Sequence, residues 1–151
     1  MTMLKPDPTP STAVLARLET LPMGTRISID HIDTVWRADI GPDLFVIIES
    51  LWRLRDAERL VCTSADDGQD FGLASPLDAA AVANELLGHA EVAGVSLDRV
   101  TSDLRFVLAD GTVFEILTDS TGYESWTAHI ADDLIVGSSD GPATYTGGQA
   151  A

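Results

Sequence analysis

The fold is decided by one stretch of the sequence, LRFVLADGTVFEIL at residues 104–117. Two runs rich in β-branched, aromatic and leucine residues, 104–109 and 112–117, flank Asp110-Gly111. Asp-Gly between two alternating runs is among the strongest short signals for a β-hairpin. The stretch therefore predicts two antiparallel strands joined by a tight turn.

Similar runs occur on both sides of this hairpin and are bounded by turn-forming residues. They predict strands at 27–29, 34–40, 44–48, 52–54, 59–63, 92–100, 126–130 and 134–136. The segment 64–75 is rich in Asp, Gly and Ser, so we expect a loop there.

Two helices are expected among these strands. Ser11 can cap a helix that places Val14, Leu15 and Leu18 on one face. The second is expected over 76–87, with Ser75 as its cap, a proline at its first position and a left-handed stop at Gly88.

The two parts of the chain share a short near-repeat. From Trp52, a serine follows twelve residues on and an aspartate fourteen, and the same offsets follow Trp126. We expect an α+β protein, mostly antiparallel sheet, made of two related β-rich halves joined by one helix, with a further helix near the N-terminus. The expected divisions are a flexible lead at 1–10, a single α+β domain at 11–140 and a flexible tail at 141–151.

The net charge of the chain limits the classes of partner that we expect it to bind. The 151 residues hold 24 Asp and Glu against 9 Lys and Arg, for a net charge of −15. Such a field repels phosphate backbones and anionic lipids and attracts cations, so we expect no nucleic-acid or membrane partner and allow a basic protein partner. The alternative is that the charge serves solubility alone.

The lone cysteine, Cys62, excludes an internal disulfide, and its apolar surroundings in the sequence predict core packing. No signal-peptide core or stretch of apolar residues long enough for a membrane span is found. These features predict a cytoplasmic protein.

No pattern points to catalysis, and we expect no catalytic residue, metal or cofactor. His31, His89 and His129 lack the spacing of zinc ligands. The acidic loop 66–70 lacks the ligand order of an EF-hand, so a solvated turn is favoured and a cation site is left open. Neither a phosphate-binding glycine loop nor a G-x-S-x-G nucleophile motif occurs.

Trp52 and Trp126 are expected to be buried anchors of the two β-rich halves. A functional alternative is a groove where the halves converge, with Trp52, Arg53, Glu124 and Trp126 as binding residues on its walls. This groove would serve either a protein or, in the rival hypothesis, a small ligand or substrate.

LRFVLADG at 104–111, followed by TGYESW at 121–126, resembles an uncharacterised family of small bacterial proteins. That family carries a strand-Asp-Gly-strand hairpin and then a Tyr-Glu-x-Trp element, and SLWRL at 50–54 is similar to its first-half Trp-Arg strand. The family has no assigned activity, and some members are similar in type to toxin immunity proteins. The resemblance implies an immunity-type inhibitor. The acidic charge of this sequence is an independent point in favour of a basic toxin as the target, and we expect a non-catalytic acidic protein-binding module.

Overall fold

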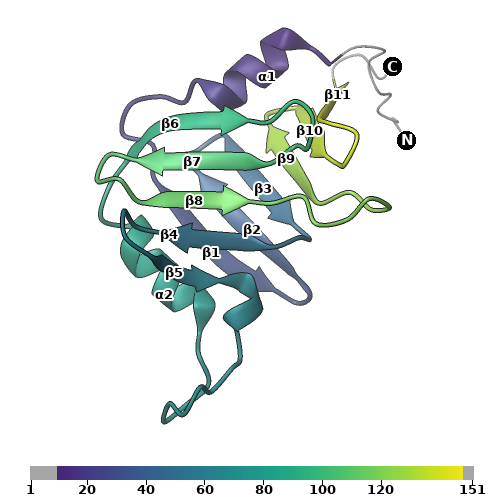
Figure 1. Cartoon of the computed structure of the whole chain (residues 1–151). Helices are drawn as coiled ribbons and strands as arrows, with labels where there is room; N and C mark the ends of the chain where they lie inside the picture. The colour runs from purple at the N-terminus through teal and green to yellow at the C-terminus, as the bar shows by residue number, and fades with distance from the viewer. Residues whose placement is uncertain (1–9, 148–151) are drawn as a thin grey trace.

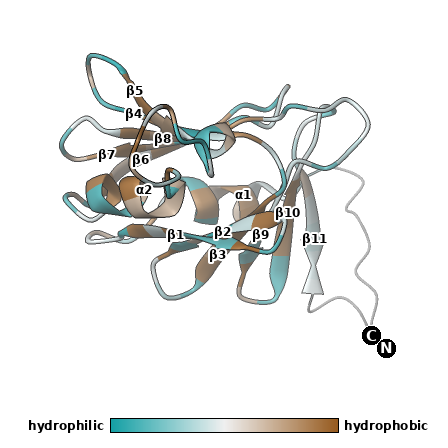
Figure 2. Ribbon diagram, turned by 90° about the horizontal axis from the view of Figure 1, so that it is seen from below, coloured by the Kyte–Doolittle hydropathy of each residue, from teal (hydrophilic) through white to brown (hydrophobic). Residues whose placement is uncertain are grey.

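A computed structural model describes residues 10–147, which form two antiparallel sheets lying face to face (Figure 1). Figure 2 shows the sheets as two layers with both helices held between them. The described chain contains far more strand than helix, which confirms the predicted α+β class.

The first sheet has six strands. They are β1 (Ile27–Ile32), β2 (Val35–Ile40), β3 (Leu44–Ile48), β9 (Trp126–Ile130), β10 (Asp133–Gly137) and β11 (Ala143–Thr146), adjacent in that order. Every neighbouring pair is antiparallel.

The second sheet has five strands. They are β5 (Leu60–Thr63), β4 (Trp52–Arg55), β8 (Val113–Ile116), β7 (Leu104–Leu108) and β6 (Val92–Leu97), adjacent in that order. The predicted Asp-Gly hairpin joins β7 to β8. Its turn closes with a bond of 3.0 Å from the Gly111 N–H to the Leu108 carbonyl. Gly111 has φ +90°, the left-handed conformation that glycine adopts without strain.

Both sheets draw strands from both parts of the chain. The chain crosses from one sheet to the other between β3 and β4 and again between β8 and β9. Consequently β3 pairs with β9 and β4 pairs with β8, across large separations in sequence.

The two helices close opposite sides of the space between the sheets. Helix α1 (Thr12–Glu19) contacts β6 and β10, whereas α2 (Ala79–Leu87) contacts β1 and β5. Ser11 caps α1 as predicted, its hydroxyl accepting from the Val14 N–H at 3.3 Å, and the predicted apolar face is buried.

The predicted start of the second helix is wrong, whereas its predicted end at Leu87 is confirmed. Asp78, not Ser75, is the cap and accepts from the Ala81 N–H. Leu77 is held outside the helix because its N–H donates to Gln69 and its carbonyl accepts from Gly68. Gly88 has φ −74°, so it does not form the expected left-handed stop.

Part of the tail expected from residue 141 onward forms a regular strand. β11 adds an edge strand to β10, and the Thr144 hydroxyl accepts from the Ser11 N–H at 2.8 Å. Residues 1–9 and 148–151, which hold the rest of the predicted lead and tail, lie outside the described residues.

A continuous hydrophobic core fills the space between the sheets. Trp52 and Trp126 are both 0% exposed, which confirms their predicted burial. The ring of Trp36 meets that of Trp52 edge-on at 5.1 Å. The indole N–H of Trp126 donates to the Ser102 carbonyl at 2.8 Å.

Candidate functional site

The four predicted binding residues do not form one groove. Trp52 and Trp126 belong to the core, so neither indole reaches a surface where a partner could touch it. Arg53 lies on the outer face of the five-stranded sheet, and Glu124 lies in the loop between β8 and β9. The two exposed residues therefore mark two different surfaces.

The first surface is an acidic hollow at the loop that connects β8 to β9. It has a volume of about 600 Å³ and is lined by Glu49, Asp119, Ser120, Gly122, Tyr123 and Glu124. Tyr123 is 80% exposed, although a tyrosine ring has a large apolar surface. We call this surface the acidic hollow.

Hydrogen bonds hold the loop that presents it. The Ser120 hydroxyl accepts from the N–H groups of Gly122 and Tyr123, both at 3.1 Å. The Asp119 carboxylate accepts from the Leu51 N–H at 2.9 Å, which ties the loop to the start of β4. The aromatic ring and its neighbouring carboxylates are therefore presented from an ordered backbone.

A second hollow, of about 270 Å³, is formed at the same loop and shares Asp119 and Ser120 with the first. It adds the carboxylate of Asp103, which accepts from the Thr118 N–H at 2.8 Å. Among the residues that the structure describes, neither hollow is lined by lysine or arginine. This end of the molecule can attract a cationic group, and the Tyr123 ring can stack against it.

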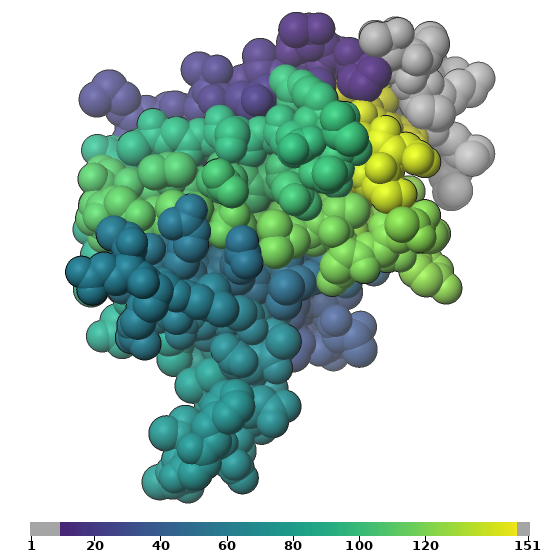
Figure 3. All heavy atoms as spheres, viewed as in Figure 1, coloured from purple at the N-terminus to yellow at the C-terminus, as the bar shows by residue number. Residues whose placement is uncertain are grey.

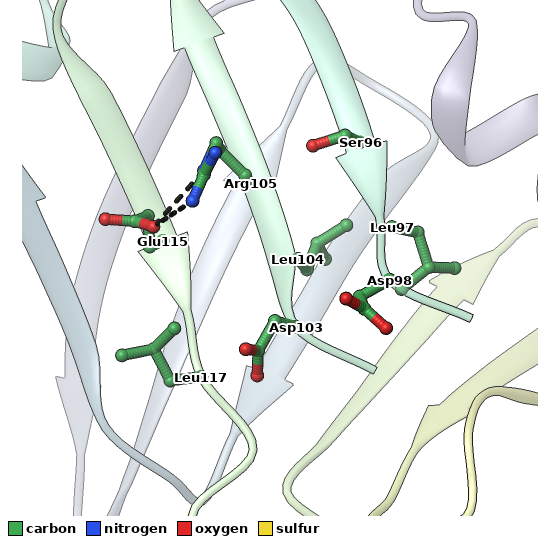
Figure 4. A pocket seen from close by; sticks show the side chains of 8 residues that line it. All are labelled: Ser96, Leu97, Asp98, Asp103, Leu104, Arg105, Glu115 and Leu117. Carbon is green, nitrogen blue, oxygen red and sulfur yellow. Dashed lines mark hydrogen bonds and ion pairs between the residues drawn. The ribbon is translucent and has the colours of Figure 1, made fainter. Parts of the chain in front are cut away.

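The second surface surrounds Arg53 and is centred on Glu115 of β8. The Glu115 carboxylate accepts from the Nε atoms of Arg53 at 3.0 Å and of Arg55 at 3.4 Å. It also accepts from Arg105, through Nε at 3.2 Å and a terminal nitrogen at 2.9 Å (Figure 4). We call these four residues the arginine cluster.

Ionisation of Glu115 is governed by opposing effects. Burial disfavours the carboxylate, but hydrogen bonds from Arg53 and Arg105 and their positive charges hold the pKa of Glu115 below its ordinary value. Glu115 is therefore a carboxylate at neutral pH. Beside it lies a further hollow lined by Asp98, Asp103 and Ser96, with Leu97 and Leu104 at its wall (Figure 4).

The predicted loop between β5 and α2 forms a projecting arm (Figure 3). Its carboxylates cap local backbone: Asp66 accepts from Thr63, Asp67 from Ala79 and Asp70 from Gly72. Among residues 10–147, no group of three or more His, Cys, Asp or Glu side chains is placed to hold a metal ion. This geometry gives no support to a cation site at residues 66–70.

Cys62 is buried in β5 and is not placed for chemistry. Burial, followed by the charges of Asp66 and Asp67, raises the pKa of its thiol to about 11. A thiol with so high a pKa remains protonated near neutral pH and is a poor nucleophile.

Sequence reasoning found one residue of each surface and missed the others. Glu49 and Glu124 approach through the pairing of distant strands, since the Glu49 N–H donates to the Ser125 carbonyl. Arg53, Glu115 and Arg105 become neighbours through the register of β4, β8 and β7. In the sequence, the only signal for this surface was that these residues occupy alternate positions within predicted strands.

Comparison with known proteins yields no relative: no family model matches the chain, and no curated protein or solved structure matches it significantly. In the part of the chain that the structure describes, neither helix has the length and apolar character needed to cross a membrane.

Proposed function

We propose that this protein is a non-catalytic binding module that holds a basic protein partner at the acidic hollow. The observation that carries the proposal is the pairing of an exposed aromatic ring, Tyr123, with the carboxylates of Glu49, Asp119 and Glu124 around one depression. Aromatic residues in a partly enclosed site supply most of the binding energy in many protein interfaces.

The charge distribution suits a basic partner. A net charge of −15 speeds the encounter with a cationic surface, while the local carboxylates select its orientation. An arginine or lysine of the partner can enter the hollow, pair with Glu49 or Glu124 and stack on the Tyr123 ring. The arrangement needs no metal, cofactor or nucleophile.

A toxin is the partner that we propose, on the expectation from the sequence patterns at residues 104–126 that the chain is similar in type to toxin immunity proteins. Toxins that cleave nucleic acids carry basic surfaces for their substrate, and an acidic inhibitor can cover such a surface by presenting carboxylates in place of phosphates. The single buried thiol of Cys62 suits a reducing compartment, and we propose a cytoplasmic location.

We further propose that the chain consists of two related halves, α1 to β5 and α2 to β10. The strand order supports this: in each half three strands lie in one sheet and the next two lie in the other. The helix of each half packs against strands of the opposite half. Trp52 and Trp126 both begin the fourth strand of their half, in agreement with the repeat in the sequence.

The rival hypothesis, a small-molecule pocket between the halves, has less support. The space between the sheets is occupied by core side chains, including both tryptophans. The hollows described above lie on the outside of the sandwich and are lined largely by polar residues.

The proposal is tested by fluorescence anisotropy with a labelled peptide of alternating arginine and glycine as a stand-in for the basic partner. Tyr123→Ala and the double variant Glu49→Gln/Glu124→Gln should each weaken binding by about tenfold, the effect of losing roughly 1.4 kcal/mol. The control double variant Glu58→Gln/Glu85→Gln removes the same charge from two exposed positions outside the hollow. Equal weakening by both double variants would mean that only net charge matters and would overturn the proposed site.

A further inference from the structure

Three members of the arginine cluster, Arg53, Glu115 and Arg105, belong to a polar row that crosses the whole outer face of the five-stranded sheet. The register pairs Thr63 with Arg53, Arg53 with Glu115, Glu115 with Arg105 and Arg105 with Ser96. Directly paired residues of neighbouring antiparallel strands project from the same face of a sheet. Five strands thus contribute one polar side chain each to a single line.

The charge of the arginine cluster is opposite to the net charge of the molecule. Arg53, Arg55 and Arg105 supply three positive charges against the carboxylate of Glu115, which leaves +2 on these four residues, while Asp98 and Asp103 line the adjoining hollow. These are three of the nine Lys and Arg residues in a chain of net charge −15. One third of the positively charged residues of the chain therefore lies in this cluster.

The geometry leaves donors free toward solvent. The side chains of Arg53, Arg55 and Arg105 are 41%, 39% and 50% exposed, whereas that of Glu115 is 3% exposed beneath them. Arg53 and Arg55 each contact Glu115 through Nε, and their terminal nitrogens have no hydrogen-bond partner among the described residues.

One positive charge is enough to neutralise the carboxylate of Glu115, but three arginines contact it. A second and third guanidinium beside the first add like-charge repulsion, and neighbouring water reduces this repulsion only in part. An anion above the cluster would remove the repulsion and use the free donors. The planar donor fork of arginine matches the oxygens of a phosphate group.

We propose that the arginine cluster binds the phosphate group of a small molecule, either inorganic phosphate or a phosphate monoester. Glu115 holds the three arginines in place from below, and the terminal nitrogens of Arg53 and Arg55 on β4, with Arg105 on β7, contact the phosphate from the two sides of β8. The hydroxyls of Thr63 and Ser96 lie at the two ends of the row and can accept or donate a bond to the rest of the ligand. Long polyanions are disfavoured by the surrounding negative charge.

The test is a titration of the full chain with inorganic phosphate, followed by amide and arginine Nε–H resonances at constant ionic strength. We expect saturable shifts confined to β4, β7 and β8, with sodium chloride at the same ionic strength producing none. A parallel titration with glycerol phosphate identifies the source of the phosphate: tighter binding of the ester indicates a phosphorylated metabolite, and equal binding indicates the free ion.

Two variants and one control decide whether the cluster is responsible. Arg105→Gln should weaken phosphate binding by about tenfold or more, because it removes a direct contact and one charge. Arg99→Gln is the matched control, since Arg99 is also 50% exposed and ion-paired to a glutamate, Glu19, on another surface.

Arg55→Gln is a second variant that should lose a binding contact without disturbing folding. The contact of Arg55 with Glu115 is the longest of the three, and Glu115 keeps two partners without it. This variant too should lose binding while its thermal unfolding matches that of the parent. Absence of saturable shifts in the parent, or parental affinity in either Arg105→Gln or Arg55→Gln, would refute the site.

Discussion

Trp126 and Gly137 lie directly opposite each other in the pairing of β9 with β10, and the indole fills the space that a side chain at position 137 would need. A Cβ placed on Gly137 would lie 2.1 Å from Cε2 and 2.2 Å from Nε1 of the indole. The glycine is therefore required by a close approach and not by its backbone conformation.

We expect Gly137→Ala to destabilise the protein by about 1–3 kcal/mol, the usual effect of forcing extra volume into a packed core. Urea denaturation measures the change in unfolding free energy. The control is Gly94→Ala in β6, where a Cβ meets nothing within 4 Å. If both variants unfold at the same urea concentration, the assigned packing of Trp126 on Gly137 is incorrect.

The two buried tryptophans should respond differently to loss of the indole N–H. Trp126 donates to Ser102, whereas the indole N–H of Trp52 has no partner among the described residues. Trp126→Phe leaves a buried carbonyl unpaired, so it should cost about 1–2 kcal/mol more than Trp52→Phe. Chemical denaturation of both variants gives the comparison, and an equal or reversed cost would contradict the hydrogen-bond assignment.

Glu115 should make the unfolding free energy of the protein depend on pH in the acid range. Its folded-state pKa lies below the ordinary 4.5, so the unfolded chain binds a proton first as pH falls. Its contribution is complete above about pH 4.5 and is lost as pH falls through the lower folded-state pKa. At neutral pH, Glu115→Gln should cost about 1–3 kcal/mol, a range that allows for the exposure of the arginines.

The measurement is the difference in unfolding free energy between parent and Glu115→Gln across pH. This difference should be largest near neutral pH and shrink on acidification. A difference that stays constant with pH would show that the glutamine disturbs packing and that the charge of Glu115 contributes nothing.

His129 should resist protonation in the folded protein. Burial, and then the positive charge of Arg37, lowers the pKa of His129 from its ordinary 6.5. Both groups contact the ring of Phe45, with the Arg37 guanidinium 3.9 Å and the imidazole 4.4 Å from its centre. Because the unfolded chain binds the proton more readily, this residue lowers stability as pH falls below about 6.5 toward the folded-state pKa.

An NMR titration of the His129 ring should give a pKa below 6.5. Arg37→Gln should raise that pKa without restoring the ordinary value, because burial remains. Arg99→Gln, which alters an ion pair with Glu19 elsewhere on the molecule, should leave it unchanged. A titration of His129 that is insensitive to Arg37→Gln would exclude the charge as a cause.

Sequence patterns alone determined the elements whose signals are local. The Asp110-Gly111 turn, the Ser11 cap and the alternating runs of the strands each depend on residues within a few positions of one another. The burial of Trp52 and Trp126 was likewise predictable, because large aromatic residues at the start of alternating strands have few places other than a core.

Tertiary structure decided which strands pair across the chain and, with them, both candidate sites. The pairings of β3 with β9 and β4 with β8 bring Glu49 near Glu124 and place Glu115 between two arginines. A strand run specifies its own alternation but not its distant neighbour, because that choice depends on which faces become buried together. The same reason applies to the start of α2, where a backbone hydrogen bond from Leu77 to Gln69 outweighed the local preference of Ser75 for a helix cap. It also applies to β11, where pairing with β10 outweighed the local preference of the glycine-rich tail.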